Sequence, residues 1–226
     1  MAQLSRTVMT TYRIERARDS ESLARQASET IATQISLVLE QRDRCTIALS
    51  GGSTPAKAYS LLGREHLPWD RVDVLLGDER WVAADDASSN ARMLRNTLLA
   101  EGPGSKATFH AVPTVELADA DASAEAFGAL VSRLCSGDPP VFDVMLLGLG
   151  DDGHTASLFP GTEAPTVADC WSTVGRGKGL DRITLTAPVL SASRQVIFLV
   201  SGAGKQEALK RLIDPDESPE RTPAKL

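Results

Sequence analysis

The stretch CTIALSGGSTPAKAY, from Cys45 to Tyr59, contains the change of structure that decides the fold. Its first five residues are short, mostly apolar and bounded by a glycine pair at 51 and 52, as expected for a buried strand. Pro55 stands where a helix accepts proline, in its first turn. The stretch therefore predicts a strand that leads through a tight turn directly into a helix.

The same alternation extends along the chain in both directions. Leu23, Ala27, Ile31, Ile35 and Val38 recur at helical spacing, which predicts a helix over 20–41. Strands are predicted at 72–76, 109–112, 141–147, 183–187 and 195–200, further helices at 89–100, 121–135 and 205–213, and no strand within 162–179. Strands separated by helices imply an α/β fold, a Rossmann-like, mainly parallel sheet with helices on both faces.

Length and composition favour a single domain. A chain of 226 residues can bury a substantial core, so we expect one domain over 1–226. The 24 Lys and Arg residues against 30 Asp and Glu residues give a net charge of −6, which argues against a nucleic-acid partner. The cysteines are few and scattered, at Cys45, Cys135 and Cys170, which favours a reducing cytoplasm over a disulfide framework.

The beginning of the chain is charged. We expect no signal peptide, because the first twenty residues have no apolar segment and already contain the charged residues Arg6, Arg13, Glu15, Arg16 and Arg18. No apolar run approaches the length of a membrane span, so we expect no membrane partner. Both patterns favour a cytoplasmic protein.

Polar, glycine-rich stretches follow four of the predicted strands. They are 50–54, 77–80, 148–154 and 201–205. In open α/β sheets, ligands bind outside the carboxyl ends of the strands. We therefore expect these four stretches to converge on one site.

Two of these stretches are suited to an anion. The N–H groups around Gly51 and Gly52, with the hydroxyls of Ser50, Ser53 and Thr54, can surround a phosphate at a helix N-terminus. The alternative is an ordinary Gly-Gly turn with a Ser/Thr cap. Lys205 begins another helix, where a positive charge is unfavourable unless an anion lies beside it; the alternative there is a solvated surface lysine.

The stretch GLGDDGHTASLFPG, residues 148–161, matches the glycine fingerprint of dinucleotide-binding proteins in its first six residues. That interpretation requires a helix and then a strand ending in an acidic residue, and neither follows. A zinc site is disfavoured because the chain has three histidines without usable spacing, and no GxSxG motif marks a serine hydrolase. His154 remains as the best proton-transfer group, oriented by Asp152 or Asp151.

Asp78 and Arg80 follow the strand predicted at 72–76. The arginine can clamp a carboxylate or phosphate or stabilise developing negative charge, and the aspartate can contact sugar hydroxyls or move a proton. The alternative is an Asp-Arg pair that only fixes the loop.

Five blocks of this sequence together resemble the 6-phosphogluconolactonase family, which shares its fold with the glucosamine-6-phosphate deaminases. The blocks are distributed over nearly the whole chain, from about 40 to 215. They are 50–55, 77–82 with Ser89-Asn90, 148–160, 182–186 and 201–205. In deaminases the sequence at this place resembles GHIAFNEPG, whereas the residues that follow Gly153-His154 here, Thr155–Pro160, match the lactonase form. The resemblance implies a hydrolase that converts 6-phospho-D-glucono-1,5-lactone to 6-phosphogluconate in the oxidative pentose phosphate pathway, with no cofactor and no required metal.

The resemblance also implies roles for the residues. His154 is expected to be the catalytic base, held by Asp152, with Arg80 as electrostatic stabiliser. The 6-phosphate is expected at Gly51, Gly52, Ser53 and Lys205 with Ser50 in the same loop, and Asp78 at the ring hydroxyls. Which of Arg176, Arg182 and Arg194 completes the anion site stays open, and a monomer or small homo-oligomer is expected.

The carboxyl-terminal region departs from the family pattern. The family usually continues beyond the Pro-Ala pair at 223–224 through a last strand, whereas this chain ends at Leu226, so we expect one edge element of the sheet to be lacking. The tail 214–226 is rich in Pro, Glu and Asp and is expected to be loosely ordered. A sugar-phosphate deaminase or isomerase and a non-catalytic sugar-phosphate sensor remain as alternative functions.

Overall fold

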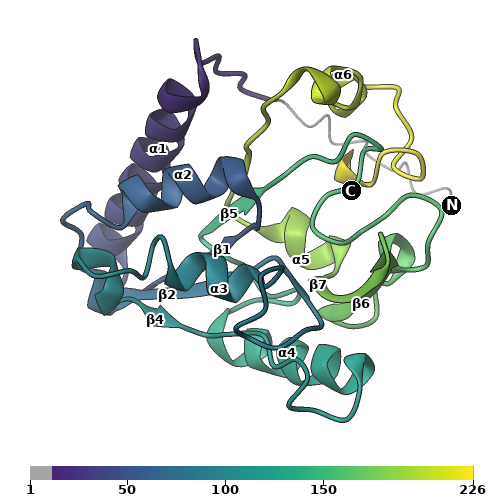
Figure 1. Cartoon of the computed structure of the whole chain (residues 1–226), viewed down its shortest axis with the longest axis horizontal. Coiled ribbons are helices and arrows are strands. Elements are labelled where there is room, and N and C mark those ends of the chain that lie inside the picture. Colours follow the sequence, from purple (N-terminus) through teal and green to yellow (C-terminus); the bar gives the residue numbers. More distant parts are fainter. Residues whose placement is uncertain (1–11, 226) are drawn as a thin grey trace, which may run out of the picture.

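The computed structural model describes residues 12–225. What the sequence predicts for residues 1–11 and 226 lies outside the described residues. A five-stranded sheet forms the centre, in the order β4-β2-β1-β5-β8 (Figure 1). Its strands are β1 (Cys45–Leu49), β2 (Val72–Leu76), β4 (Thr108–Phe109), β5 (Val144–Leu147) and β8 (Gln195–Phe198).

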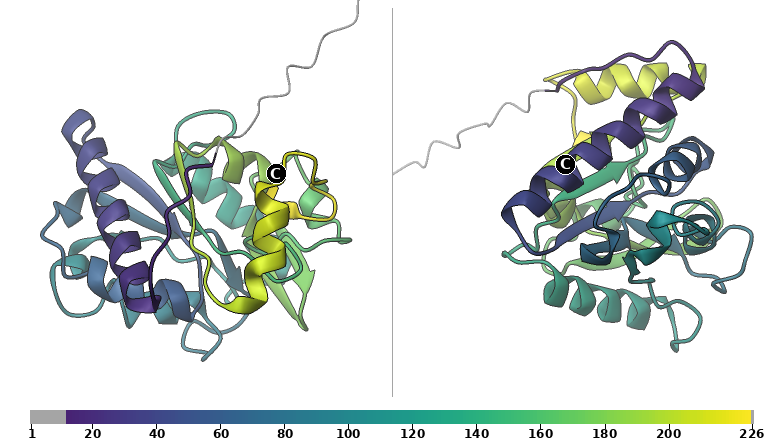
Figure 2. Two further views of the ribbon diagram at one scale, coloured as in Figure 1. Left: turned by 90° about the horizontal axis from the view of Figure 1, so that it is seen from above. Right: turned by 90° about the vertical axis from the view of Figure 1, so that its left-hand side faces the viewer.

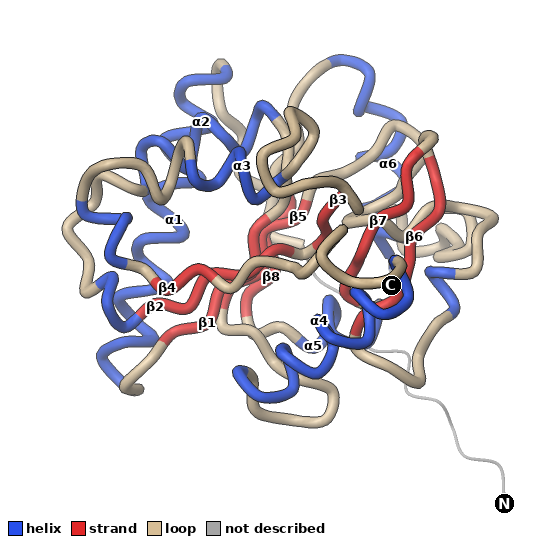
Figure 3. The backbone as a smooth tube through the Cα atoms, turned by 60° about the horizontal axis from the view of Figure 1, so that its bottom comes forward, coloured by secondary structure: helices blue, strands red, loops and turns tan. Residues whose placement is uncertain are grey.

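All neighbours in this sheet are parallel, with Cys45 opposite Val72 and Val144 opposite Gln195. β1, β2 and β5 are entirely buried, because their apolar side chains are covered on both faces. Figure 3 shows helices on both sides of the sheet. They are α1 (Ser20–Gln41), α2 (Ser53–Leu62), α3 (Asn90–Arg95), α4 (Ala120–Leu134), α5 (Ala187–Ala192) and α6 (Gln206–Ile213). The predicted α/β class and mainly parallel sheet are thus confirmed.

A second, antiparallel sheet was not predicted. It has the order β3-β7-β6 and consists of β3 (Asp78–Arg80), β7 (Leu180–Leu185) and β6 (Ser172–Gly177). The expectation of no strand within 162–179 is therefore wrong. β6 has the sequence STVGRG, whose glycines and arginine hide the strand pattern, and its pairing with β7 holds it extended. The helix predicted over 89–100 is also too long, since α3 ends at Arg95.

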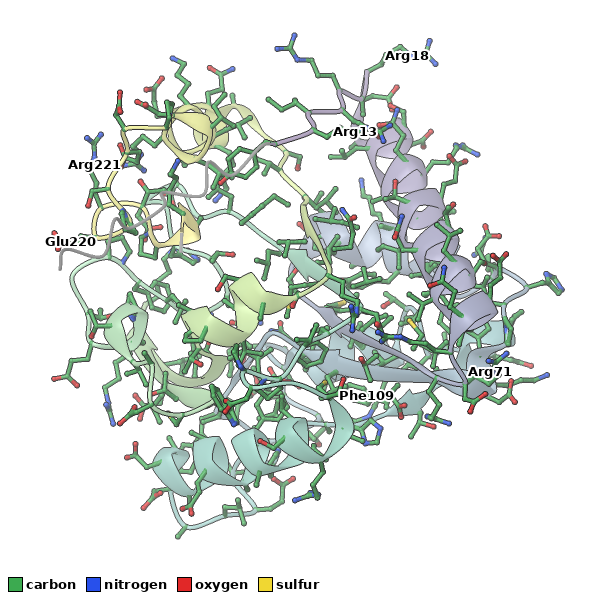
Figure 4. All side chains as sticks on the ribbon, turned by 180° about the vertical axis from the view of Figure 1, so that it is seen from behind. Arg13, Arg18, Arg71, Phe109, Glu220 and Arg221 are labelled. Carbon is green, nitrogen blue, oxygen red and sulfur yellow. The ribbon has the colours of Figure 1, made fainter. Side chains whose placement is uncertain are left out.

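Asp143 and Arg71 make polar contacts near the amino ends of the central strands. Asp143 accepts hydrogen bonds from Arg42 (2.7 Å) and from the backbone of Thr46 (3.0 Å), and Arg194 lies 3.3 Å away. Arg71 donates to the carbonyls of Leu39 and Arg42 at the end of α1, a position that Figure 4 shows. These contacts satisfy polar groups at the edge of the sheet opposite to the glycine-rich loops.

The exposed edge of β8 borders a groove of about 630 Å³. Residues of α1 and residues 223–225 are among those that line it. The left view of Figure 2 shows where α1 and the carboxyl-terminal end of the chain lie in the ribbon. Thr222, Pro223 and Ala224 are buried, and the backbone N–H of Ala224 donates to Gly153 (3.1 Å), unlike the loose packing expected for the tail. Between residues 12 and 225, no helix is long and apolar enough to cross a membrane.

Candidate functional site

The loops after β1, β2, β5 and β8 leave the sheet at the same edge, because these strands are parallel. The hydroxyls of Thr54 and Ser201 lie 2.8 Å apart and join the first loop to the last. A methyl group on Gly51 would overlap the side chain of Asn90, so only glycine lets the first loop approach the segment after β3 this closely. The predicted convergence of the four loops is therefore observed.

The β1–α2 loop presents backbone donors to solvent. Gly52 caps α2 with a φ of 118°, a left-handed value that favours glycine, and no side chain caps the helix. Gly52 and Ser53 are exposed, so the first N–H groups of α2 are available to an anion. Ser50 differs from this expectation: its hydroxyl is buried without a hydrogen-bond partner among residues 12–225, and its backbone groups bind the hydroxyl of Tyr59.

The loop after β5 carries His154 and the residue that orients it. Oδ1 of Asp152 lies 2.5 Å from Nδ1 of His154 and accepts the backbone N–H of His154 at 3.1 Å. The backbone N–H of Gly150 donates to the carbonyl of His154 (2.8 Å), and a side chain on Gly150 would strike the imidazole. This turn therefore fixes both the backbone and the ring of His154.

The charges at this pair suit a general base. Burial lowers the pKa of His154, outweighing the opposite effect of Asp152, so the imidazole is neutral at pH 7. Burial alone would raise the pKa of Asp152, but hydrogen bonds from His154 hold it below its ordinary value. An ionised Asp152 can only accept, so Nδ1 carries the proton and Nε2 keeps its lone pair. Nε2 makes no hydrogen bond to any described residue.

Arg80 lies on β3 and is held by the segment before α3. Its Nη1 donates to Oδ1 of Asn90 (2.7 Å) and to the carbonyl of Ser88 (2.5 Å). Arg182 stands directly opposite Arg80 across the β3–β7 pair, and both Nε atoms are buried with no hydrogen-bond partner in the described part of the chain. Like charges directly opposite are unfavourable in a sheet, so the two guanidinium groups form a place where an anion would be stabilising.

Asp78 is buried between protein groups. Its Oδ2 accepts a hydrogen bond from the hydroxyl of Ser157 (2.6 Å) and lies 3.9 Å from Nη1 of Arg182. Its Oδ1 makes no hydrogen bond to any residue from 12 to 225, and only that oxygen is left for a ligand. The Asp78–Arg80 pair considered from the sequence is thus not the contact observed: Arg182 is the arginine beside Asp78, while Arg80 binds Ser88 and Asn90.

Two further residues complete the surroundings of His154. The ring of Phe159 lies 4.7 Å from that of His154, and the guanidinium of Arg182 lies 5.5 Å from the ring of Phe159. The sequence left Arg182 as one of three candidates, because it lies far from these residues in the chain. Phe159 is close to His154 in the chain, but the sequence gave it no role of its own. Arg176 instead lies near Asp121 and Asp181 with its side chain mostly exposed, and Arg194 lies at Asp143, at the opposite edge of the sheet.

Lys205 lies beside the β5 loop. It ends a short 3-10 turn before α6, and its Nζ is 4.0 Å from Oδ1 of Asp151. The Thr54–Ser201 contact brings the same segment against the start of α2. Among residues 12–225, no group of three or more His, Cys, Asp or Glu side chains is arranged to hold a metal ion.

Comparisons with known proteins show the family and the fold. The family model described as glucosamine-6-phosphate isomerases/6-phosphogluconolactonase matches residues 18–226. A 6-phosphogluconolactonase from Synechocystis sp. is 42% identical over 211 residues, which cover 92% of this chain and 88% of that protein. The crystal structure of a 6-phosphogluconolactonase from Shewanella baltica superposes with a TM-score of 0.83 and 29% identity, covering 91% of this chain and 87% of the other.

The fold is also shared with a deaminase. A monomeric glucosamine-6-phosphate deaminase has a TM-score of 0.76 at 22% identity, covering 92% of this chain and 89% of that one. At this identity the likeness concerns the fold alone. The resemblance that the five sequence blocks predicted is confirmed by these matches.

Proposed function

Because this chain belongs to the family of glucosamine-6-phosphate isomerases and 6-phosphogluconolactonases, we propose that it hydrolyses 6-phospho-D-glucono-1,5-lactone to 6-phospho-D-gluconate. Two relatives that are 42% identical to it are 6-phosphogluconolactonases, hydrolases of this lactone ester that act in the oxidative pentose phosphate pathway. The proposal places the enzyme in the cytoplasm, in agreement with the scattered cysteines.

The observation that carries the mechanism is the Asp152–His154 pair with its unoccupied Nε2. Nε2 takes a proton from water while the water oxygen bonds to the lactone carbonyl carbon. The tetrahedral oxyanion is stabilised by the guanidinium of Arg80. On collapse the bond from the former carbonyl carbon to the ring oxygen breaks, and His154 returns the proton to that oxygen as the ring opens.

Substrate binding would use the loops on either side. The exposed N–H groups at Gly52 and Ser53, with Gly51 and Lys205, hold the 6-phosphate, and Arg182 adds a buried cation beside Arg80. The free Oδ1 of Asp78 would accept a ring hydroxyl. Fixing the phosphate positions the carbonyl near His154 and applies remote binding energy to the reaction. The sequence at 155–160 favours this activity over the deaminase alternative.

The test follows lactone loss when glucose-6-phosphate dehydrogenase generates the substrate. His154→Gln should lower kcat by about a hundredfold or more and leave the Kd for 6-phosphogluconate nearly unchanged. Near-normal turnover would contradict the assignment of His154 as the base.

Lys205→Ala should raise KM for the phosphorylated lactone much more than for gluconolactone, because only the first substrate carries the phosphate. Equal effects on both substrates would contradict the assignment of Lys205 to the phosphate site.

A further inference from the structure

Three cationic side chains surround one exposed aspartate beside His154. Nζ of Lys178 lies 3.7 Å and Nζ of Lys205 4.0 Å from the same oxygen, Oδ1 of Asp151. Arg211 donates from Nη2 to the backbone carbonyl of Asp151 (3.2 Å). The chain as a whole carries a net charge of −6, so this concentration of positive charge is local. The two lysines meet one oxygen, as they would meet an oxygen of a phosphate group.

The backbone of Lys178 is held in an unfavourable conformation. Lys178 has a φ of 56° and is followed by Gly179 with a φ of 82°, at the turn between β6 and β7. Two-residue hairpin turns of this kind favour asparagine and glycine. Between residues 12 and 225, Ala156 is the other non-glycine with a positive φ, and it lies in the loop of His154. Strained residues of this type gather at functional sites.

The hairpin does not need Asp151 to stay in place. β6 pairs with β7 over six residues, and β7 pairs in turn with β3. The side chain of Asp151 is 69% exposed, so its ion pairs with the two lysines are weak and open to exchange. The positive charge of Lys178 also reaches the catalytic pair, because it contributes to lowering the pKa of His154.

We propose that Lys178 is a second lysine of the phosphate site, binding the 6-phosphate together with Lys205. In the free protein Asp151 occupies the place of a phosphate oxygen between the two ammonium groups, and the incoming phosphate displaces it. Two cations match the charge of a phosphate ester, which is close to −2 at neutral pH. This inference rests on the proposed function, since it names further machinery of the same site.

The test compares three variants in calorimetric titrations with 6-phosphogluconate and with inorganic phosphate. Lys178→Asn removes the charge and keeps a residue that suits the turn. It should raise the Kd for both ligands about tenfold, because one charge-assisted contact is lost. Lys210→Asn, on the exposed side of α6, is the matched control and should leave both Kd values unchanged. Asp151→Asn should tighten phosphate binding about threefold, because the competing carboxylate is gone.

The opposite changes in phosphate affinity expected for Lys178→Asn and Asp151→Asn distinguish a binding role of Lys178 from a purely structural one. If the Lys178–Asp151 pair only anchored the hairpin, Lys178→Asn and Asp151→Asn would both weaken binding, and the proposal would be overturned. An unchanged Kd in Lys178→Asn would also overturn it. Calorimetry needs no turnover: a wild type that binds 6-phosphogluconate but hydrolyses no lactone refutes the proposed function alone, and a wild type that binds neither ligand refutes both.

Discussion

At the scale of single residues, the chemistry depends on the protonation of His154. A base must be unprotonated, and burial already lowers the pKa of His154 from 6.5, so activity should extend to mildly acidic pH. Asp152 acts in the opposite direction on this pKa, since it stabilises the imidazolium, while it also fixes the proton on Nδ1. The two effects of Asp152 can be separated in a pH profile.

Asp152→Asn should therefore change two quantities. The plateau of kcat should fall by about a hundredfold, because an amide no longer enforces the productive tautomer. The acidic limb of the kcat/KM profile should move to lower pH, because a charge that raised the pKa of His154 is removed. Lys178→Asn should move that limb to higher pH, since Lys178 acts in the opposite sense. Limbs that move in the same direction in both variants would contradict this electrostatic account.

The sequence predicted contacts between near neighbours in the chain better than contacts between distant residues. His154 and Asp152 are two positions apart in one loop, so their contact could be inferred from the chain alone. Arg182 is about a hundred positions from Arg80, and only the register of β3 against β7 places them face to face. That register depends on tertiary pairing, which no local pattern of residue types records.

At the scale of elements, Glu79 joins β3 to α3. Its two oxygens accept the backbone N–H groups of Arg80, Asn90 and Ala91 at 2.7–2.8 Å and the hydroxyl of Ser89 at 3.1 Å. Burial raises the pKa of Glu79 even though all these donors favour the charged form. The carboxylate thus satisfies the first donors of α3 and fixes Asn90, which in turn holds Arg80.

Glu79→Gln should destabilise the protein by about 2 kcal/mol, because the amide NH₂ cannot accept and leaves buried donors unpaired. It should also lower kcat/KM about tenfold, because Asn90 no longer holds Arg80 firmly. Urea denaturation and the coupled assay measure the two effects. Glu101→Gln, at an exposed turn, is the control and should change neither. Full activity together with lost stability would limit Glu79 to a structural role.

The elements themselves were predictable where one pattern dominated. The period of α1 and the continuous apolar runs of β1, β2 and β5 are strong local signals, and the structure places these elements as predicted or within a few residues. β3 and β6 carry Asp, Glu, Arg and Gly instead, and they are strands because β7 lies between them with its backbone groups available. Tertiary pairing overrides residue preference at these two strands.

At the scale of the whole molecule, both sheets share one core. Ile183 and Leu185 of β7 and Val174 of β6 belong to the same cluster of buried side chains as the central strands. α4 contributes to this union, since Phe127 lies in the cluster and a side chain on Gly128 would contact Ser172. Separating the antiparallel sheet would expose this apolar surface to water at about 25 cal/mol per Å².

We therefore predict that the chain unfolds as a single domain in one cooperative transition. Trp69 is buried beside the central sheet, whereas Trp171 directly precedes β6, so the two indoles report on different sheets. The third tryptophan, Trp81, is replaced in both variants. Urea curves from Trp81→Phe/Trp171→Phe, which retains the Trp69 signal, and from Trp69→Phe/Trp81→Phe, which retains the Trp171 signal, should each coincide with the far-UV circular dichroism of the same variant. A Trp171 signal that changes at lower urea than the dichroism would show that the antiparallel sheet unfolds independently and would contradict the prediction.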